Sequence, residues 1–125
     1  MNEFTIYVKN KPGALAMVCD ILYKNGVNIE SLATEGTRED GTIKMITNDV
    51  NTTRRALDDE KMQYTVEEIL VAKVLNRPGE LSKLTRKIAE ANISIISIYL
   101  LGEGKFALRV DNAEKAKEVL KDKIL

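Results

Sequence analysis

The feature that most constrains this chain is an internal repeat. The phrase "NKPGALAMVCDILYKNGVNIESL" begins at Asn10, and the similar phrase "NRPGELSKLTRKIAEANISIISI" begins at Asn76. The two phrases align without a gap, and the alignment resumes further on at a slightly shorter offset. The change in offset falls between "EGTREDGT" in the first copy and "GEG" in the second, where exposed turns tolerate insertions. The chain must therefore fold as two copies of one unit.

Local patterns predict the same order of elements in each copy. In the first copy, an apolar run at Phe4–Val8 reads as a strand, and a Pro-Gly turn follows it. Leu15, Val18 and Leu22 then recur on one face of a helix that stops at Asn25-Gly26. A strand, a polar hairpin, another strand, a second helix and a final strand complete the unit. This order is βαββαβ, the ferredoxin-like motif, in which an antiparallel sheet has both helices on one face.

The second copy restarts at once, without a linker. We therefore expect two domains, at residues 1–67 and 68–125, and an α+β fold of two tandem repeats. The spacing Asp111-x-x-Glu114 predicts a capping box at the start of the last helix, with Asp111 as the cap. Only "DKIL" follows that helix, so the last strand of the second domain is expected to be short or absent.

Composition excludes several classes of function. Lys plus Arg equals Asp plus Glu, at 19 each, whereas nucleic-acid binding relies on many basic phosphate contacts. The chain has no His and one Cys, which excludes a Ser-His-Asp triad, a His-ligated zinc site and an internal disulfide. We expect no metal, no cofactor and no catalysis. The N-terminus does not resemble a signal peptide and no apolar run spans a bilayer, so the cytoplasm is the expected compartment.

The repeated phrase resembles the ACT domain family. The family's pattern is a strand, an Asn/Asp-x-Pro-Gly-x-Leu turn into a helix, and then a "G-x-N-I" strand start. The first copy matches it at Asn10, Pro12, Gly13, Leu15, Gly26, Asn28 and Ile29. The second copy keeps Asn76, Pro78, Gly79, Leu81 and Ile95, but it has Asn92 and Ser94 where the first has Gly26 and Asn28.

The resemblance implies a regulatory module that binds a free amino acid. In this family, paired units commonly join their antiparallel sheets edge to edge through the second strands. The ligand then lies between the first turn of one unit and the second strand of the other. For this chain, the resemblance implies a small stand-alone protein of two ACT-like repeats, a dimer, and a partner enzyme of amino-acid metabolism or another regulator.

The chemistry of the turn suits such a ligand. The first turn of a helix offers unpaired N–H groups and a positive dipole end to a carboxylate, and a glycine lets the ligand approach the backbone. The candidate ligand-binding residues are Asn10, Pro12, Gly13, Ala14, Leu15, Asn28, Ile29, Asn76, Pro78, Gly79, Glu80, Leu81, Ser94 and Ile95. Glu80 is negative where Ala14 is neutral, so we expect the Asn10 turn, completed by the strand that starts at Ser94, to be the better site.

Other readings remain open at this point. The Pro-Gly turns are also good turn chemistry with no ligand at all. A second hypothesis is a protein-interaction or assembly module whose unpaired strand edges bind another protein. A third is an enzyme on a ferredoxin-like scaffold, similar to acylphosphatase, for which Arg77 but not Lys11 has the expected residue type.

Overall fold

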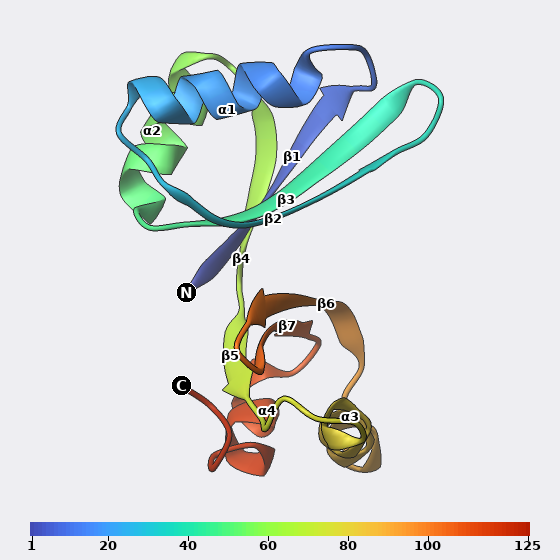
Figure 1. The fold of residues 1–125 in the computed structure, drawn as a ribbon. Helices are drawn as coiled ribbons and strands as arrows, with labels where there is room; N and C mark the ends of the chain where they lie inside the picture. The colour runs from blue at the N-terminus through green and yellow to red at the C-terminus, as the bar shows by residue number, and fades with distance from the viewer. The chain divides into compact units, whose positions relative to one another are not determined.

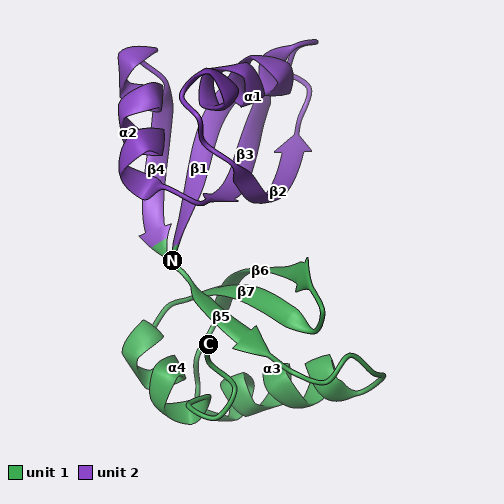
Figure 2. Ribbon diagram, turned by 60° about the vertical axis from the view of Figure 1, so that its left-hand side comes forward, with its two compact units in different colours: residues 1, 68–125 green, residues 2–67 purple.

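The structure is a computed structural model that describes residues 1–125. The chain divides into two compact units, coloured separately in Figure 2. The N-terminal unit comprises residues 2–67, and the C-terminal unit comprises Met1 and residues 68–125. Each unit has its own sheet and its own pair of helices (Figure 1). Each also has its own cluster of buried apolar side chains. The α+β fold of two βαββαβ-like units is confirmed.

The N-terminal unit contains a four-stranded sheet in the order β2-β3-β1-β4, with antiparallel pairing of β3 to both β1 and β2. Its elements are β1 (Asn2–Lys9), α1 (Ala14–Lys24), β2 (Ile29–Gly36), β3 (Asp40–Thr47), α2 (Val50–Asp59) and β4 (Gln63–Glu68). The predicted hairpin is shorter than its polar sequence suggested, because Gly36 and Gly41 still pair as ladder partners. Only residues 37–39 lie between β2 and β3.

One face of this sheet packs against both helices. Alternation along β1 directs Phe4 and Ile6 to the helix side, where both side chains are fully buried. Val18 and Leu22 of α1 are also fully buried and belong to the same cluster as the β1 side chains. The helical spacing seen in the sequence is therefore the core-facing stripe of α1.

The C-terminal unit repeats the pattern with a smaller sheet, in the order β5-β7-β6. Its elements are β5 (Leu70–Lys73), α3 (Glu80–Glu90), β6 (Ile95–Gly102), β7 (Lys105–Val110) and α4 (Ala113–Val119). A single antiparallel bridge between Ala72 and Ile124 stands where the first copy has a full fourth strand. The stub expected from the short "DKIL" segment is therefore present as one bridge.

A separate core holds this second unit together. Leu84 and Ile88 of α3 pack with Leu108 of β7, and Ala116 of α4 and the following Leu120 close the cluster. All five are at most 3% exposed. Burial of a Leu or Ile side chain contributes about 1.5–3 kcal/mol, so each unit has its own source of stability. No helix in the chain is both long enough and apolar enough to cross a bilayer.

The second helix of each unit, α2 or α4, begins with the same kind of side-chain cap, although both helices lie beyond the aligned phrases. Asp49 caps α2 by accepting a hydrogen bond from the Thr52 N–H, and Asn112 caps α4 by accepting one from the Lys115 N–H. The prediction that Asp111 caps α4 was wrong by one residue. Asp111 instead uses its side chain to bind the start of β6, as described below.

Candidate functional site

The first strand–helix turn begins with an unusual backbone conformation. Gly13 precedes α1 with φ of +88°, in the left-handed region that disfavours every residue with a Cβ. A Cβ at this position would meet no atom within 4 Å, so the conformation itself, and not crowding, requires glycine. Pro12, the residue before Gly13, has its own φ fixed by the proline ring. The local sequence therefore determines the direction in which α1 leaves the turn.

Two backbone donors at the start of α1 have no partner in the protein. The Ala14 N–H bonds to the Lys11 carbonyl at 3.2 Å and the Met17 N–H to the Gly13 carbonyl at 2.9 Å, but the N–H groups of Leu15 and Ala16 make no hydrogen bond. No side chain caps the helix. Unpaired donors at the positive end of a helix dipole have the chemistry that suits a carboxylate.

Asn10 connects this turn to the β2–β3 hairpin. Its side-chain amide nitrogen donates to the Thr37 carbonyl, and its backbone N–H donates to the Glu39 carbonyl at 2.8 Å. The side chain also lies over Gly36, where an added Cβ would come within 3.0 Å of the Asn10 amide nitrogen. Asn10 therefore has a structural role, and its side-chain oxygen remains available as an acceptor.

A pocket of about 220 Å³ lies between this turn and the end of β2. Asn10, Leu15 and Ala16 line one side, and Thr34, Glu35 and Gly36 line the other. Four of the predicted site residues, Asn10, Gly13, Ala14 and Leu15, thus meet in one pocket. Pro12 is exposed beside them without lining it.

The pocket is lined by both charged and apolar residues. Lys11 and Glu35 both line it, and neither side chain has a hydrogen bond or an ion pair. Val8 and Ile43 contribute apolar surface from β1 and β3. The register of β2 directs the Glu35 side chain to the other face of the sheet, beside Thr42. The pocket therefore offers backbone donors, one free ammonium and an apolar wall within a small volume.

The predicted residues at the start of β2 lie elsewhere in the N-terminal unit. The pocket is at the end of β2, whereas Asn28 and Ile29 are at its beginning. The Asn28 N–H donates to the Asn48 side-chain oxygen at 3.0 Å, and the Asn28 carbonyl accepts from the Asn48 N–H at 3.1 Å. This pair fixes the start of β2 beside the end of β3.

The same arrangement recurs at Ser94 in the C-terminal unit. The Ser94 N–H donates to the Asp111 carboxylate at 3.0 Å, and the Ser94 carbonyl accepts from the Asp111 N–H at 3.1 Å. Ile95 is half-buried against the second core. The backbone N–H and carbonyl groups of Asn28 and Ser94, two of the candidate ligand-binding residues, are thus used within their own units. That the opposite repeat completes each cleft stays a prediction.

The second turn has the same backbone as the first. Gly79 precedes α3 with φ of +90°, and the N–H groups of Leu81 and Ser82 make no hydrogen bond. Pro78 and Asn76 are exposed, and the Asn76 side chain has no hydrogen-bond partner. The repeat therefore preserves the bend and the free donors, but not the side-chain link to the hairpin.

Glu80 gives the second turn a different electrostatic character. Its residue is only 9% exposed, and its carboxylate accepts a hydrogen bond of 2.8 Å from Arg77 Nε and lies 3.6 Å from Lys83 Nζ. The Arg77 hydrogen bond, with Lys83 assisting, holds the pKa of Glu80 below its ordinary value. An anionic side chain therefore occupies the first turn of α3, where α1 has the small Ala14.

The hairpin beside the second turn is also built differently. The Val74 N–H donates to the Gly104 carbonyl at 2.9 Å, and a Cβ on Gly104 would come within 2.1 Å of the Val74 carbonyl oxygen. The β6–β7 hairpin thus packs its backbone directly against the end of the preceding strand. The longer β2–β3 hairpin is linked through the Asn10 side chain instead.

Sequence reasoning missed the hairpin's share of the first pocket. Thr34, Glu35, Gly36 and Gly41 line it, although the motif alone gave no reason to include them. The available signal was the pair of glycines in "EGTREDGT", since glycine in a strand often marks close approach by another part of the chain. No cluster of His, Cys, Asp and Glu is arranged to hold a metal ion.

Comparisons with known proteins agree with this architecture. A family model described as an ACT domain pair matches residues 1–125. Protein BT0572 from Bacteroides thetaiotaomicron has a similar structure, with a TM-score of 0.92 and 24% identity over 99% of this chain and 90% of that one. The ligand-free regulatory subunit of aspartate kinase from Thermus thermophilus gives a TM-score of 0.73 and 13% identity over 96% and 88% of the two chains.

A third similar structure is the regulatory subunit of aspartate kinase from Thermus flavus. Its TM-score is 0.68, with 13% identity over 97% of this chain and 90% of that one. No curated protein sequence matches. All three structural likenesses are below 25% identity and show the fold, whereas the family model spans the whole chain. The chain therefore belongs to the ACT domain family, as an ACT domain pair.

Proposed function

We propose that this chain is a non-catalytic, cytoplasmic regulatory protein that binds a free amino acid at the Asn10–Leu15 turn. The observation that carries the proposal is the pocket beside that turn. Leu15 and Ala16, whose backbone N–H groups have no partner, both line it. Its volume of about 220 Å³ is smaller than the roughly 300–1,000 Å³ of pockets for drug-sized ligands. It therefore suits a metabolite of a few heavy atoms.

The arrangement of groups matches the two charges of an amino acid. The α-carboxylate accepts hydrogen bonds from the N–H groups of Leu15 and Ala16, which have no other partner. The α-ammonium group donates a hydrogen bond to the side-chain oxygen of Asn10, which has no other partner. Val8 and Ile43 favour an apolar side chain on the ligand.

The family supports a regulatory role. Two of the similar structures are regulatory subunits of aspartate kinase, an enzyme of amino-acid metabolism. We propose that occupancy of the pocket stabilises one state of the protein or of a homodimer, which a partner enzyme or regulator then recognises. A ligand shifts such an equilibrium only by its difference in affinity between the two states.

A thermal-shift screen of the full chain against the twenty amino acids tests the proposal. A ligand at one hundred times its dissociation constant stabilises the folded state by about 2.7 kcal/mol. We expect one or a few apolar amino acids to raise Tm, and their methyl esters, which lack the carboxylate charge, to have no effect. The absence of a shift with all twenty would reject amino-acid binding.

Leu15 and Ala16 act through backbone donors, so the matched variants alter the neighbouring side chains. Asn10→Ala removes the proposed contact to the ammonium group, and calorimetry is expected to show weaker binding. Asn76→Ala, at the equivalent position of the second turn, serves as the control and is expected to bind as the original chain does. Equal weakening by Asn10→Ala and Asn76→Ala would contradict the assignment to the first turn.

One observation favours the alternative of an assembly module. Strand β6 lies at the edge of the C-terminal unit's sheet, and its side chains Ile96, Ile98 and Leu100 are 51%, 37% and 68% exposed. An apolar edge strand is suited to pairing with another chain. A dimer whose stability responds to Leu100→Lys but to no amino acid would support this function in place of the first.

A further inference from the structure

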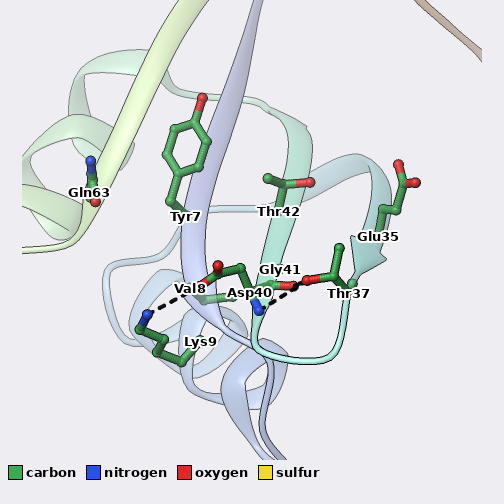
Figure 3. A pocket seen from close by; sticks show the side chains of 10 residues that line it. Tyr7, Val8, Lys9, Glu35, Thr37, Asp40, Gly41, Thr42 and Gln63 are labelled. Atoms are coloured by element: carbon green, nitrogen blue, oxygen red, sulfur yellow. Dashed lines mark hydrogen bonds and ion pairs between the residues drawn. The ribbon is translucent and has the colours of Figure 1, made fainter.

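A second pocket lies on the other face of the N-terminal unit's sheet. It has a volume of about 490 Å³ and is lined by residues of β1, β2, β3 and β4 (Figure 3). The strand register pairs Tyr7 with Thr42, Thr42 with Glu35, and Lys9 with Asp40, which places these side chains on one face. Because Ile6 and Val8 alternate with them and pack toward the helices, this face is the one without helices.

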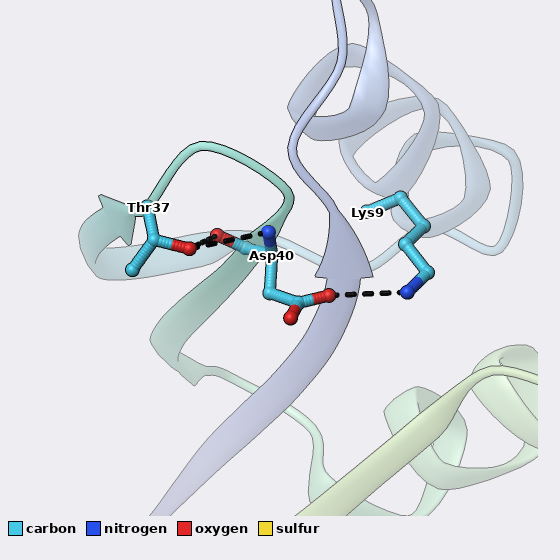
Figure 4. Close-up of polar contacts among 3 residues, drawn as sticks. All are labelled: Lys9, Thr37 and Asp40. Atoms are coloured by element: carbon cyan, nitrogen blue, oxygen red, sulfur yellow. Dashed lines mark hydrogen bonds and ion pairs between the residues drawn. The ribbon is translucent and has the colours of Figure 1, made fainter.

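The cation and one of the acids in this pocket neutralise each other. Lys9 Nζ lies 3.1 Å from Asp40 Oδ1, an exposed ion pair drawn in Figure 4. The Thr37 hydroxyl fixes the same corner by accepting from the Asp40 N–H at 3.3 Å and donating to the Asp40 carbonyl at 3.1 Å. Lys9 thus has an ion-pair partner within the pocket, and the Thr37 hydroxyl fixes the Asp40 backbone.

Glu35 is the charged residue of this pocket that has no partner. Its side chain lines the pocket from the end of β2 and has neither a hydrogen bond nor an ion pair. With Lys9 and Asp40 paired, the residues that line the pocket keep one net negative charge, and Lys44, further along the same face of β3, does not line it. Its charge therefore complements a cation and repels an anion.

Tyr7 adds a surface that cations also favour. Its ring stands on β1 between Gln63 and Thr42 in Figure 3, and the residue is 42% exposed. The face of an aromatic ring attracts an ammonium group, and the adjacent Thr42 hydroxyl and Gln63 amide oxygen accept hydrogen bonds. The ring also offers apolar area to an alkyl chain.

We propose that this pocket binds a small organic cation, a primary ammonium group carried on an alkyl chain. The ammonium group pairs with Glu35, and the chain lies along the Tyr7 ring toward the acceptors on Thr42 and Gln63. The volume lies within the roughly 300–1,000 Å³ typical of small-molecule pockets. The two pockets share Val8, Glu35, Gly36 and Gly41 as lining residues. The side chains that carry this proposal, those of Tyr7, Glu35 and Thr42, lie on the face of the sheet opposite the turn pocket.

NMR titration of the full ¹⁵N-labelled chain with cadaverine, a five-carbon diamine, tests the proposal. We expect saturable shifts of the amides of Tyr7, Thr42 and Gln63, reduced by added salt because the pairing is solvent-exposed. Glutarate, a dianion of the same carbon length, is expected to leave these amides unchanged. Equal shifts with glutarate, or no saturable shift with cadaverine, would overturn the proposal.

Variants separate this site from a general charge effect. Tyr7→Leu and Glu35→Gln are each expected to weaken cadaverine binding at least tenfold. Glu39→Gln, which removes an acid from the same hairpin outside the pocket, is expected to change it less than twofold. Equal losses in Glu39→Gln and Glu35→Gln would mean that only the net charge matters, and would also overturn the proposal.

A third variant separates this site from the amino-acid site. Lys11→Arg/Ala14→Glu alters only the turn pocket and is expected to leave cadaverine binding unchanged. Tyr7→Leu, which alters only the sheet-face pocket, is expected to leave amino-acid binding unchanged. A loss of cadaverine binding in Lys11→Arg/Ala14→Glu would contradict a site on the open face of the sheet.

Discussion

The two strand–helix turns share a backbone and differ in chemistry. Gly13 and Gly79 have φ values of +88° and +90°, and each helix begins with two unpaired N–H groups. Yet Ala14 leaves the first turn open, whereas Glu80 places a carboxylate, paired with Arg77, in the second. The repeated motif thus specifies a bend and a set of donors. The residue after the glycine decides whether the donors face a pocket or an anionic side chain.

The neighbouring hairpins extend this difference. The β2–β3 hairpin reaches Asn10 through Thr37 and forms a wall of the first pocket. The shorter β6–β7 hairpin packs Gly104 against Val74 by backbone alone. The difference in length between the two hairpins therefore changes which groups surround a bend that both turns share.

The largest expected effect tests what the turns share. Gly13→Ala and Gly79→Ala each force a Cβ into the left-handed region, which costs about 1–2 kcal/mol. Because neither position has an atom within 4 Å of the added Cβ, the two costs are expected to be equal. Urea denaturation of the full chain measures both. A large difference between them would show that the two bends are not equivalent.

The next effect tests what the turns do not share. Lys11→Arg/Ala14→Glu copies the second turn into the first, and it is expected to weaken amino-acid binding about tenfold, or about 1.4 kcal/mol. The introduced carboxylate repels that of the ligand. Calorimetry measures the change, and Glu80→Ala, made in the other turn, is the control. Unchanged affinity would contradict the role assigned to the residue after the glycine.

A smaller effect concerns the two asparagines. Asn10→Ala removes the side-chain bond to the Thr37 carbonyl, and a hydrogen bond contributes about 0.5–1.5 kcal/mol. We expect the lower part of that range because the site is exposed. Asn76 has no such bond, so Asn76→Ala is expected to change the free energy of unfolding by less than about 0.5 kcal/mol. Denaturant titration compares them, and an equal cost would remove the structural distinction.

The smallest effect depends on pH. The pKa of Glu80 is lowered from its ordinary value of 4.5, chiefly by the Arg77 hydrogen bond. A lowered folded-state pKa gives stability that is complete above pH 4.5 and is lost as the pH falls through the folded-state value. The Tm difference between the original chain and Glu80→Gln should therefore be largest near neutral pH and shrink in acid.

The control for this pH series is Glu90→Gln, at the other end of α3. Glu90 has no ion pair, so its removal is expected to give a small Tm difference that changes little over the same pH range. A Tm difference for Glu80→Gln that grew as the pH fell would contradict the stabilising pair with Arg77.

The fold followed from the sequence because its signals are local. The helix stripe of Leu15, Val18 and Leu22, the glycine at each bend and the duplicated order are all readable within short windows. The resemblance carried by the Asn-x-Pro-Gly-x-Leu turns is confirmed by the family model. The single-bridge fourth strand also followed from the length of its segment.

The candidate site could be predicted from the sequence only in part, because it depends on contacts between segments that are distant in the chain. Gly13, Ala14 and Leu15 were predictable from the turn, but Thr34 and Glu35 enter the pocket through the hairpin register. The capping prediction was wrong because two adjacent residues, Asp111 and Asn112, both suit a helix start. Only the fold shows that Asp111 is already bound to the start of β6.

An NMR titration of the ¹⁵N-labelled chain with the best amino acid from the thermal screen tests the central claim most directly. We predict saturable shifts at the amides of Leu15 and Ala16 and at Thr34–Gly36, with the amides of Leu81 and Ser82 nearly unmoved. Equal, saturable shifts in both turns, or binding that leaves Leu15 and Ala16 unmoved, would contradict the claim that the open first turn holds the ligand's carboxylate.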